Sequence, residues 1–195
     1  MMKPVEFNDR PFSMIVNTSA TRFVAKPPHE VWAFFSNIEN WSKFVSGAVK
    51  NCWTCDDAPR VGATFTMEFD YFGTNYVHQN IVTRCEPNRL FAVKPVHGIF
   101  PLLETFIRVE EAPGGSRVTY MVDAGPAVAF LSWAAFLLMA PVMRQLMNMV
   151  ISRELERACA ILVGEGDPEI KHQGALDELK DRFFGTRATI ARGRH

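Results

Sequence analysis

Two periods of hydrophobic and polar residues follow one another along the chain. From Ala63 to Tyr71, apolar residues alternate with polar ones, which predicts a β-strand with one buried and one solvated face. Behind Pro27 and Pro28, apolar residues recur every three or four positions up to Phe44, which predicts a pair of short helices. We therefore expect strands and helices within one domain.

Further strands are predicted where β-branched and aromatic residues lie between turn signals. These strands cover residues 12–24, 76–85, 90–96, 103–110 and 117–122, with another beginning at Ala48. After Gly125 the helical period continues up to Val163, with a kink or break expected at Pro141. The order is β-α-α-β6-α with about seven antiparallel strands. Because such a curved sheet needs a helix to cover its concave face, the pattern predicts an α+β domain with a cavity between sheet and helix.

Four short motifs lie in the helical pair and at turns between strands. They are residues 28–41 (PHEVWAFFSNIENW), 61–62 (VG), 86–90 (EPNRL) and 114–120 (GGSRVTY). In these motifs the chain resembles the START-like (SRPBCC) superfamily, which includes pollen allergens, polyketide cyclases/dehydrases and coenzyme-Q-binding proteins. The resemblance implies a helix-grip fold around an apolar pocket, and it leaves the substrate and the question of enzyme activity open.

The resemblance covers residues 12–163, which we expect to form a helix-grip ligand-binding domain. Glycines at 164 and 166 and Pro168 end the long helix. Residues 164–195 are then predicted to be a C-terminal appendage. This appendage carries a short amphipathic helix, with Leu176, Leu179 and Phe183 on one side.

The composition is that of a globular protein without a strong net charge. The 195 residues are 48% apolar, and 21 Lys and Arg balance 21 Asp and Glu. Without a basic field to hold a phosphate backbone, the sequence argues against nucleic-acid binding. Residues 1–20 lack the continuous apolar core of a secretory signal, so we expect a cytoplasmic protein.

An apolar segment near the start of the long helix raises the question of membrane contact. Pro126 and Pro141 bracket residues 127–140, and a helix of that length rises about 21 Å against a hydrocarbon core of about 30 Å. The length favours a buried or surface-docking helix over a spanning one. Because 127–140 is apolar all round, the pocket covers only part of it, and a homodimer contact or a membrane-surface contact through this segment stays open.

The cysteines offer a weak signal for chemistry. Cys52 and Cys55 form a Cys-x-x-Cys motif, but the sequence contains no second pair of Cys or His with zinc-ligand spacing. Residues three apart in a strand also point to opposite faces. We therefore expect reduced structural thiols, no metal site and no cofactor.

Histidines and tyrosines in or beside the strands are the acid/base candidates. They are His78, His97, Tyr71, Tyr76 and Tyr120. For the strand of residues 76–85, two sets of side chains could face inward. Either Tyr76, His78 and Asn80 share the inner face and give the pocket a polar wall, or Val77, Gln79 and Ile81 do, and His78 is solvated.

Glu154 lies inside the apolar stripe of the long helix. Met143, Met147, Val150, Ala158 and Ile161 form this stripe, and Glu154 is four residues from both Val150 and Ala158. Its carboxylate then faces the sheet. It either reaches to water or pairs with Arg108 or Arg117, or it orients a ligand or moves a proton. Glu104 is a second candidate for a buried carboxylate.

The leading functional hypothesis is that a hydrophobic small molecule, such as a lipid, quinone or polyaromatic, binds between the sheet and the helix. The expected ligand-binding residues are Phe65, Met67, Phe69, Tyr71, Met143, Met147 and Val150. One alternative is a polyketide cyclase/dehydrase-like enzyme that uses the same cavity with His78, Tyr120 or Glu154 as acid/base. Another is an interaction protein that docks through residues 127–140.

Overall fold

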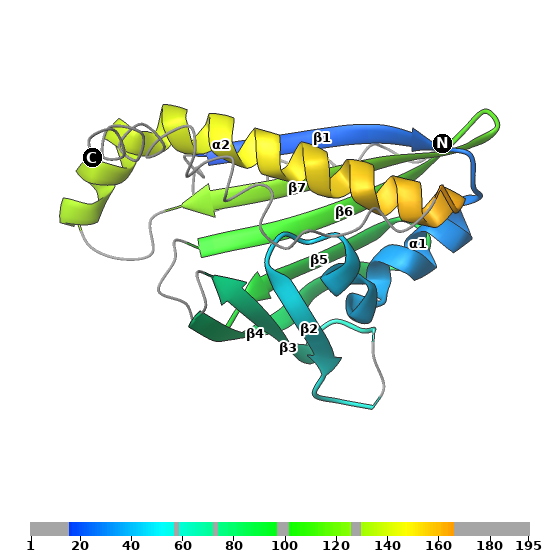
Figure 1. Cartoon of the computed structure of the whole chain (residues 1–195), viewed down its shortest axis with the longest axis horizontal. Helices are drawn as coiled ribbons and strands as arrows, with labels where there is room; N and C mark the ends of the chain where they lie inside the picture. Colours follow the sequence, from blue (N-terminus) through cyan, green and yellow to red (C-terminus); the bar gives the residue numbers. More distant parts are fainter. Residues whose placement is uncertain (1–15, 57–58, 72–73, 97–101, 126–129, 166–195) are drawn as a thin grey trace, which may run out of the picture.

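A seven-stranded antiparallel sheet carries two short helices at one end and a long helix along its inner side (Figure 1). The computed structural model describes residues 16–56, 59–71, 74–96, 102–125 and 130–165. The elements are β1 (Val16–Val24), α1 (Pro28–Ser36), the 3-10 helix η1 (Ile38–Lys43), β2 (Ala48–Trp53), β3 (Thr64–Tyr71), β4 (Thr74–Glu86), β5 (Leu90–Pro95), β6 (Leu102–Ala112), β7 (Gly115–Gly125) and α2 (Phe130–Val163). This order confirms the predicted α+β helix-grip fold with a β-α-α-β6-α arrangement.

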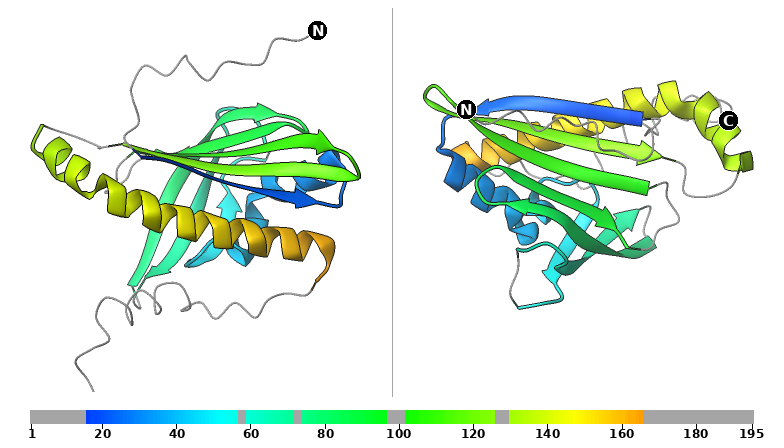
Figure 2. Two further views of the ribbon diagram at one scale, coloured as in Figure 1. Left: turned by 90° about the horizontal axis from the view of Figure 1, so that it is seen from above. Right: turned by 180° about the vertical axis from the view of Figure 1, so that it is seen from behind.

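Sequential hairpins build most of the sheet. Each strand from β2 to β7 pairs with the next, and β1 pairs with β7, which gives the order β1-β7-β6-β5-β4-β3-β2. The helical pair carries the chain from β1 at one edge to β2 at the other. Helix α2 packs along β1 and β7, and Figure 2 shows it running lengthwise beside that part of the sheet.

The inner face of the sheet, which bears the main core, packs against α2. Val82, Ile107, Val118 and Tyr120 from the sheet are buried together with residues from the C-terminal half of the helix. The helical side chains are Ile151, Leu155 and Ala158. Their spacing of four and three residues places them on one side of α2, so this half of the helix is attached to the sheet by apolar burial.

The helical pair closes one end of the sheet with aromatic side chains. The indole N–H of Trp41 donates to the Phe35 carbonyl at 2.8 Å, and the Trp41 ring packs edge-on against Phe65 and Phe91. The side chain of Asn37 accepts the Glu39 backbone N–H at 3.1 Å and caps η1. The motif of residues 28–41 therefore serves the packing of this end.

Helix α2 continues through Pro141, so the predicted break is absent, and Figure 1 shows the helix changing direction in its first turns. Within the described residues, no helix is long and apolar enough to span a membrane. Leu138 and Val142 are 82% and 53% exposed, whereas Ala140 between them is buried.

The sequence-based boundaries agree with the structure to within a few residues where both exist. The first strand, expected over 12–24, is described from Val16. His97 and the amphipathic helix with Leu176, Leu179 and Phe183 lie outside the described residues. The division into a domain of residues 12–163 and an appendage of residues 164–195 stays a prediction.

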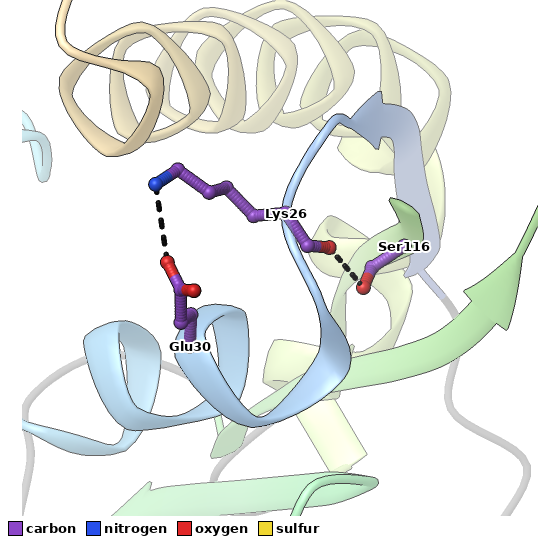
Figure 3. A network of polar contacts seen from close by, with 3 residues as sticks. All are labelled: Lys26, Glu30 and Ser116. Carbon is purple, nitrogen blue, oxygen red and sulfur yellow. Dashed lines mark hydrogen bonds and ion pairs between the residues drawn. The ribbon is translucent and has the colours of Figure 1, made fainter. Parts of the chain in front are cut away.

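The connection from β1 to α1 is held against the start of β7 (Figure 3). The buried Ser116 hydroxyl donates to the Lys26 carbonyl at 2.7 Å, and the Lys26 ammonium pairs with Glu30 at 3.1 Å. Gly115 lies so close that a Cβ there would be 2.2 Å from the Val24 carbonyl oxygen. The backbone of β1 therefore meets β7 without room for a side chain at this point.

Removing the two contacts shown in Figure 3 should have unequal effects on stability. Ser116→Ala leaves the Lys26 carbonyl without its buried partner and should lower the free energy of unfolding by about 1–2 kcal/mol. Glu30→Gln breaks a solvent-exposed ion pair and should cost less than about 0.5 kcal/mol. Urea denaturation of both variants measures the difference. Equal losses would contradict the assignment of the connection to the serine hydrogen bond.

Candidate functional site

The register between β3 and β4 settles which residues of β4 face inward. Tyr76 lies opposite Phe69, His78 opposite Met67, and Asn80 opposite Phe65. Directly opposed residues in antiparallel strands share a face. Since Phe65 and Met67 belong to the main core, Tyr76, His78 and Asn80 face inward, which is the first of the two predicted alternatives. His78 is therefore on the inner face.

The inner face becomes more exposed along β4 toward the β3–β4 turn. The exposed fraction of the side chain rises from 1% at Val82 to 6% at Asn80 and 42% at Tyr76, with His78 half-buried between them. Phe69 is also half-buried, and its ring meets the His78 ring edge-on at 5.4 Å between centroids. We call the inner-face residues Met67, Phe69, Tyr76 and His78 the open wall.

The expected ligand-binding residues of β3 differ in their surroundings. Phe65 is fully buried and packs edge-on against Trp41 and Trp53, so it belongs to the closed core. Met67 is nearly buried and Phe69 is half-buried, which places both at the transition to solvent. Tyr71 ends β3, and its side chain lies outside the described part of the structure.

On α2, the predicted methionines are half-buried. Met143 packs against Val16, Ala124 and Ala140, and Met147 packs against the main core. Val150 is half-buried as well. The stripe expected from the sequence included the fully buried Ala158 but missed Ile151 and Leu155, although both continue the spacing of four residues from Met147.

The open wall and the N-terminal half of α2 belong to different parts of the sheet. The helix packs along β1 and β7, whereas the open wall is on β3 and β4, beyond β6 and β5. At the other end of the sheet, α1 and η1 fill the inner face with aromatic side chains. Solvent therefore reaches apolar inner-face residues at the end away from α1.

Asn51 is a polar residue of the inner face that the sequence analysis did not single out. It lies on β2 opposite Met67, so Asn51, Met67 and His78 form one row across three strands. Its side chain is only 6% exposed. Neither its amide nitrogen nor its amide oxygen has a hydrogen-bond partner within the described part of the chain. In the sequence, a single asparagine within a strand gave no indication that its amide is buried without a partner.

Glu154 lies on the side of α2 that faces the sheet, and it is buried there beside the segment that leads into β2. Its side chain is 4% exposed. The Ser46 backbone N–H donates to Oε1 at 2.8 Å, and the Tyr120 hydroxyl donates to Oε2 at 3.3 Å. The expectation that Glu154 faces the sheet is correct. The expected pairing with Arg108 or Arg117 is wrong, because both arginines alternate with inward residues and lie on the outer face.

Burial sets the proton affinity of this pair. Desolvation raises the pKa of Glu154 from 4.5 to about 7, against the lowering effects of the Ser46 and Tyr120 hydrogen bonds and of the Arg157 charge. Desolvation and the neighbouring carboxylate raise the pKa of Tyr120 well above 10. Tyr120 therefore stays a hydrogen-bond donor at neutral pH, whereas Glu154 exchanges a proton there.

The acid/base candidates fall into two groups. Tyr120 and Glu154 are in direct contact, whereas His78 is on β4, separated from β7 by β6 and β5. Three strand spacings amount to about 14 Å. Glu104 is opposite Asp123 on the outer face and accepts the Thr83 hydroxyl at 2.8 Å, so it does not reach the open wall.

The cysteine motif shows ordinary thiols. Cys52 is exposed, Cys55 is half-buried, and both are free. No group of three His, Cys, Asp or Glu side chains that could hold a metal ion occurs among the residues described. The absence of a metal from the protein stays a prediction.

Comparisons with known proteins agree with the fold. Residues 16–160 match the family described as polyketide cyclase / dehydrase and lipid transport. No curated protein matches the chain. The protein TTHA0849 from Thermus thermophilus superposes with a TM-score of 0.61 and 13% identity over 77% of this chain and 99% of that chain.

Two further solved structures have a similar fold. The di-domain aromatase/cyclase StfQ from the steffimycin biosynthetic pathway has a TM-score of 0.60 and 13% identity, covering 77% of this chain and 51% of that one. A START superfamily protein from Mycobacterium smegmatis has a TM-score of 0.59 and 13% identity, covering 76% and 97%. At such identity the likeness shows the fold alone. Because the family match spans residues 16–160, the chain belongs to the polyketide cyclase/dehydrase and lipid transport family.

Proposed function

We propose that the protein binds a hydrophobic small molecule, such as a lipid, a quinone or a polyaromatic, between the open wall and the N-terminal half of α2. The observation that carries the proposal is the partial exposure of apolar inner-face residues at one end of an otherwise buried core, with Phe69 beside His78 on the wall. Covering apolar surface releases about 25 cal/mol per Å². A ligand that covers this wall would therefore be held by apolar burial.

The side chains around this region suit ligands of varied shape. Met67 on the wall and Met143 and Met147 on α2 are unbranched, and the two helical methionines are half-buried. Methionine adapts to irregular surfaces at little cost. The family match to cyclases and lipid transport proteins supports the same class of hydrophobic ligand.

Catalysis by the same fold is a second candidate, favoured by the contact between Glu154 and Tyr120. A carboxyl with a pKa of about 7 can give and take a proton at neutral pH, and the phenol can donate a hydrogen bond to a developing oxyanion. Both groups are buried where the C-terminal half of α2 meets β7. A substrate would have to displace the packing around these two residues to meet them, so binding is the function that the described residues support best.

Contact of residues 127–140 with a second copy or a membrane surface stays a proposal, as does a cytoplasmic location. The exposed Leu138 and Val142 support an apolar surface on this part of α2.

Binding of an uncharged dye tests the proposed site. N-phenyl-1-naphthylamine fluoresces strongly only in apolar surroundings, and we expect the native protein to enhance its emission saturably. Phe69→Ser removes an aromatic ring from the open wall and should weaken binding about tenfold. Phe23→Ser makes the same change on the outer face, where Phe23 is 57% exposed, and should leave the affinity unchanged.

Circular dichroism and thermal melts establish that both serine variants stay folded. If the native protein and Phe69→Ser bind the dye with equal affinity, the dye does not bind at the open wall. Absence of saturable enhancement with the native protein would remove the support for ligand binding altogether.

The titration of Glu154 predicts a pH dependence of stability. Since its pKa is raised from 4.5 to about 7 on folding, the folded state holds the proton more tightly, and stability falls as pH rises from about 4.5 to about 7. The loss is on the order of 3 kcal/mol. Glu154→Gln keeps an acceptor without the charge, so its free energy of unfolding should exceed that of the native protein at pH 8 and should lack this decline.

Urea denaturation at several pH values measures the difference between the two proteins. Glu156→Gln on the exposed side of α2 serves as the control and should follow the native profile. If Glu154→Gln also runs parallel to the native profile, Glu154 does not titrate near neutrality, and acid/base chemistry at this pair loses its basis.

A further inference from the structure

We propose that Asn51 is the polar anchor of the ligand site, and that it selects a hydrophobic molecule bearing an uncharged group with an adjacent hydrogen-bond donor and acceptor. A carboxamide, an undissociated carboxylic acid or a hydroxy ketone has this chemistry. This inference rests on the proposed binding function and names the class of ligand that the open wall takes.

The position of Asn51 places it at the margin of the open wall. In the register of β2, β3 and β4, its row with Met67 and His78 lies between two other rows. The row with Trp53 and Phe65 belongs to the closed core. In the row on the other side, Tyr76 is exposed and Phe69 half-buried, whereas Ala48 on β2 is buried. A ligand that covers Phe69 and enters toward the core therefore meets the Asn51 row first.

The hydrogen-bonding state of Asn51 is unlike that of the other asparagines described in the interior. The Asn80 amide donates to the His78 carbonyl at 3.4 Å, and the Asn40 amide donates to the Phe34 carbonyl at 3.0 Å. Both amide atoms of Asn51 are buried without a partner in the described structure. Most buried polar side-chain atoms have at least one partner, and a buried amide without one is costly. The amide thus offers a donor and an acceptor together to an incoming group.

A second buried polar atom without a partner among the described residues is the indole nitrogen of Trp32. It is on α1, at the end of the sheet that the aromatic cluster closes. The indole nitrogen can only donate a hydrogen bond, whereas the Asn51 amide can both donate and accept. Asn51 is the residue of the two that lies beside the open wall.

The charges around Asn51 favour an uncharged ligand group. None of the described inner-face residues of β2, β3 and β4 is Lys, Arg, Asp or Glu. The neighbouring Lys50 and Glu68 are opposite each other on the outer face. A carboxylate or phosphate placed at this row would be desolvated without a facing Lys or Arg from β2, β3 or β4, which is unfavourable. A neutral polar group avoids that cost and satisfies the amide.

A matched pair of probes tests the selection. 2-Naphthamide carries the complementary donor and acceptor, and 2-isopropylnaphthalene has the same shape without them. The ratio of their dissociation constants, measured by naphthalene fluorescence, is compared between the native protein and Asn51→Leu. We expect this ratio to shift toward the hydrocarbon by about tenfold or more in Asn51→Leu, because a site with a buried unpaired amide discriminates against a ligand that cannot satisfy it.

Two further variants keep the test independent of folding. Asn51→Ala removes the same amide and should shift the ratio in the same direction. Met67→Leu changes the neighbouring side chain in the same row without altering hydrogen bonding, and should leave the ratio unchanged. The ligand-free Asn51→Leu protein should also have a higher Tm than the native protein, since the variant removes a buried amide without a partner.

The outcomes separate this inference from the proposed function. If both probes bind the native protein but their ratio is unchanged in Asn51→Leu and Asn51→Ala, Asn51 is not the anchor, although the binding site stands. A lower Tm of ligand-free Asn51→Leu would show that a bound water already satisfies the amide, and it would overturn the inference in the same way. If neither probe binds the native protein, the proposed function fails, and the inference fails with it.

Discussion

The attachment of α2 through its C-terminal half is the interaction on which the rest of the structure depends. Ile151, Leu155 and Ala158 bury their side chains against the sheet, and Glu154 among them accepts hydrogen bonds from Ser46 and Tyr120. The helix is thereby fixed to β7 and to the segment that leads into β2. Its N-terminal half then extends along the sheet with methionines and exposed apolar side chains, and does not close the open wall. An apolar region accessible to ligands is left on β3 and β4, because α2 packs along β1 and β7.

The inner face combines this apolar region with a small number of polar groups. His78 and Asn80 precede Val82 along β4, and Asn51 faces the same side from β2. Apolar burial supplies affinity without direction, whereas a buried amide distinguishes ligands by what they can donate and accept. Glu154 and Tyr120 are separated from His78 by more than the three strand spacings of about 14 Å, because the row of Tyr120 meets β4 at Cys85. They satisfy each other, so their present role is to join α2 to β7.

The sequence predicted the fold because its turns and periods leave few alternatives. Gly62, Asn88 and Gly114 lie in the motifs that resemble the superfamily, and all three adopt positive φ, which explains why such residues mark those turns. The side of β4 that faces inward could not be predicted, since both alternating sets of residues mix polar and apolar side chains. The partners of Glu154 were also inaccessible, because Ser46 is 108 residues away in the chain. Asn51 became recognisable only when the register placed it beside Met67.

Native mass spectrometry of the full chain, purified without detergent, tests the central claim most directly. We expect a fraction of the protein to carry an added mass that is released by organic extraction and that belongs to an uncharged hydrophobic molecule. The native protein exposed to a mixture of neutral lipids, quinones and polyaromatics should take up one molecule per chain. A spectrum that shows the bare polypeptide alone, both as purified and after this exposure, would contradict the account.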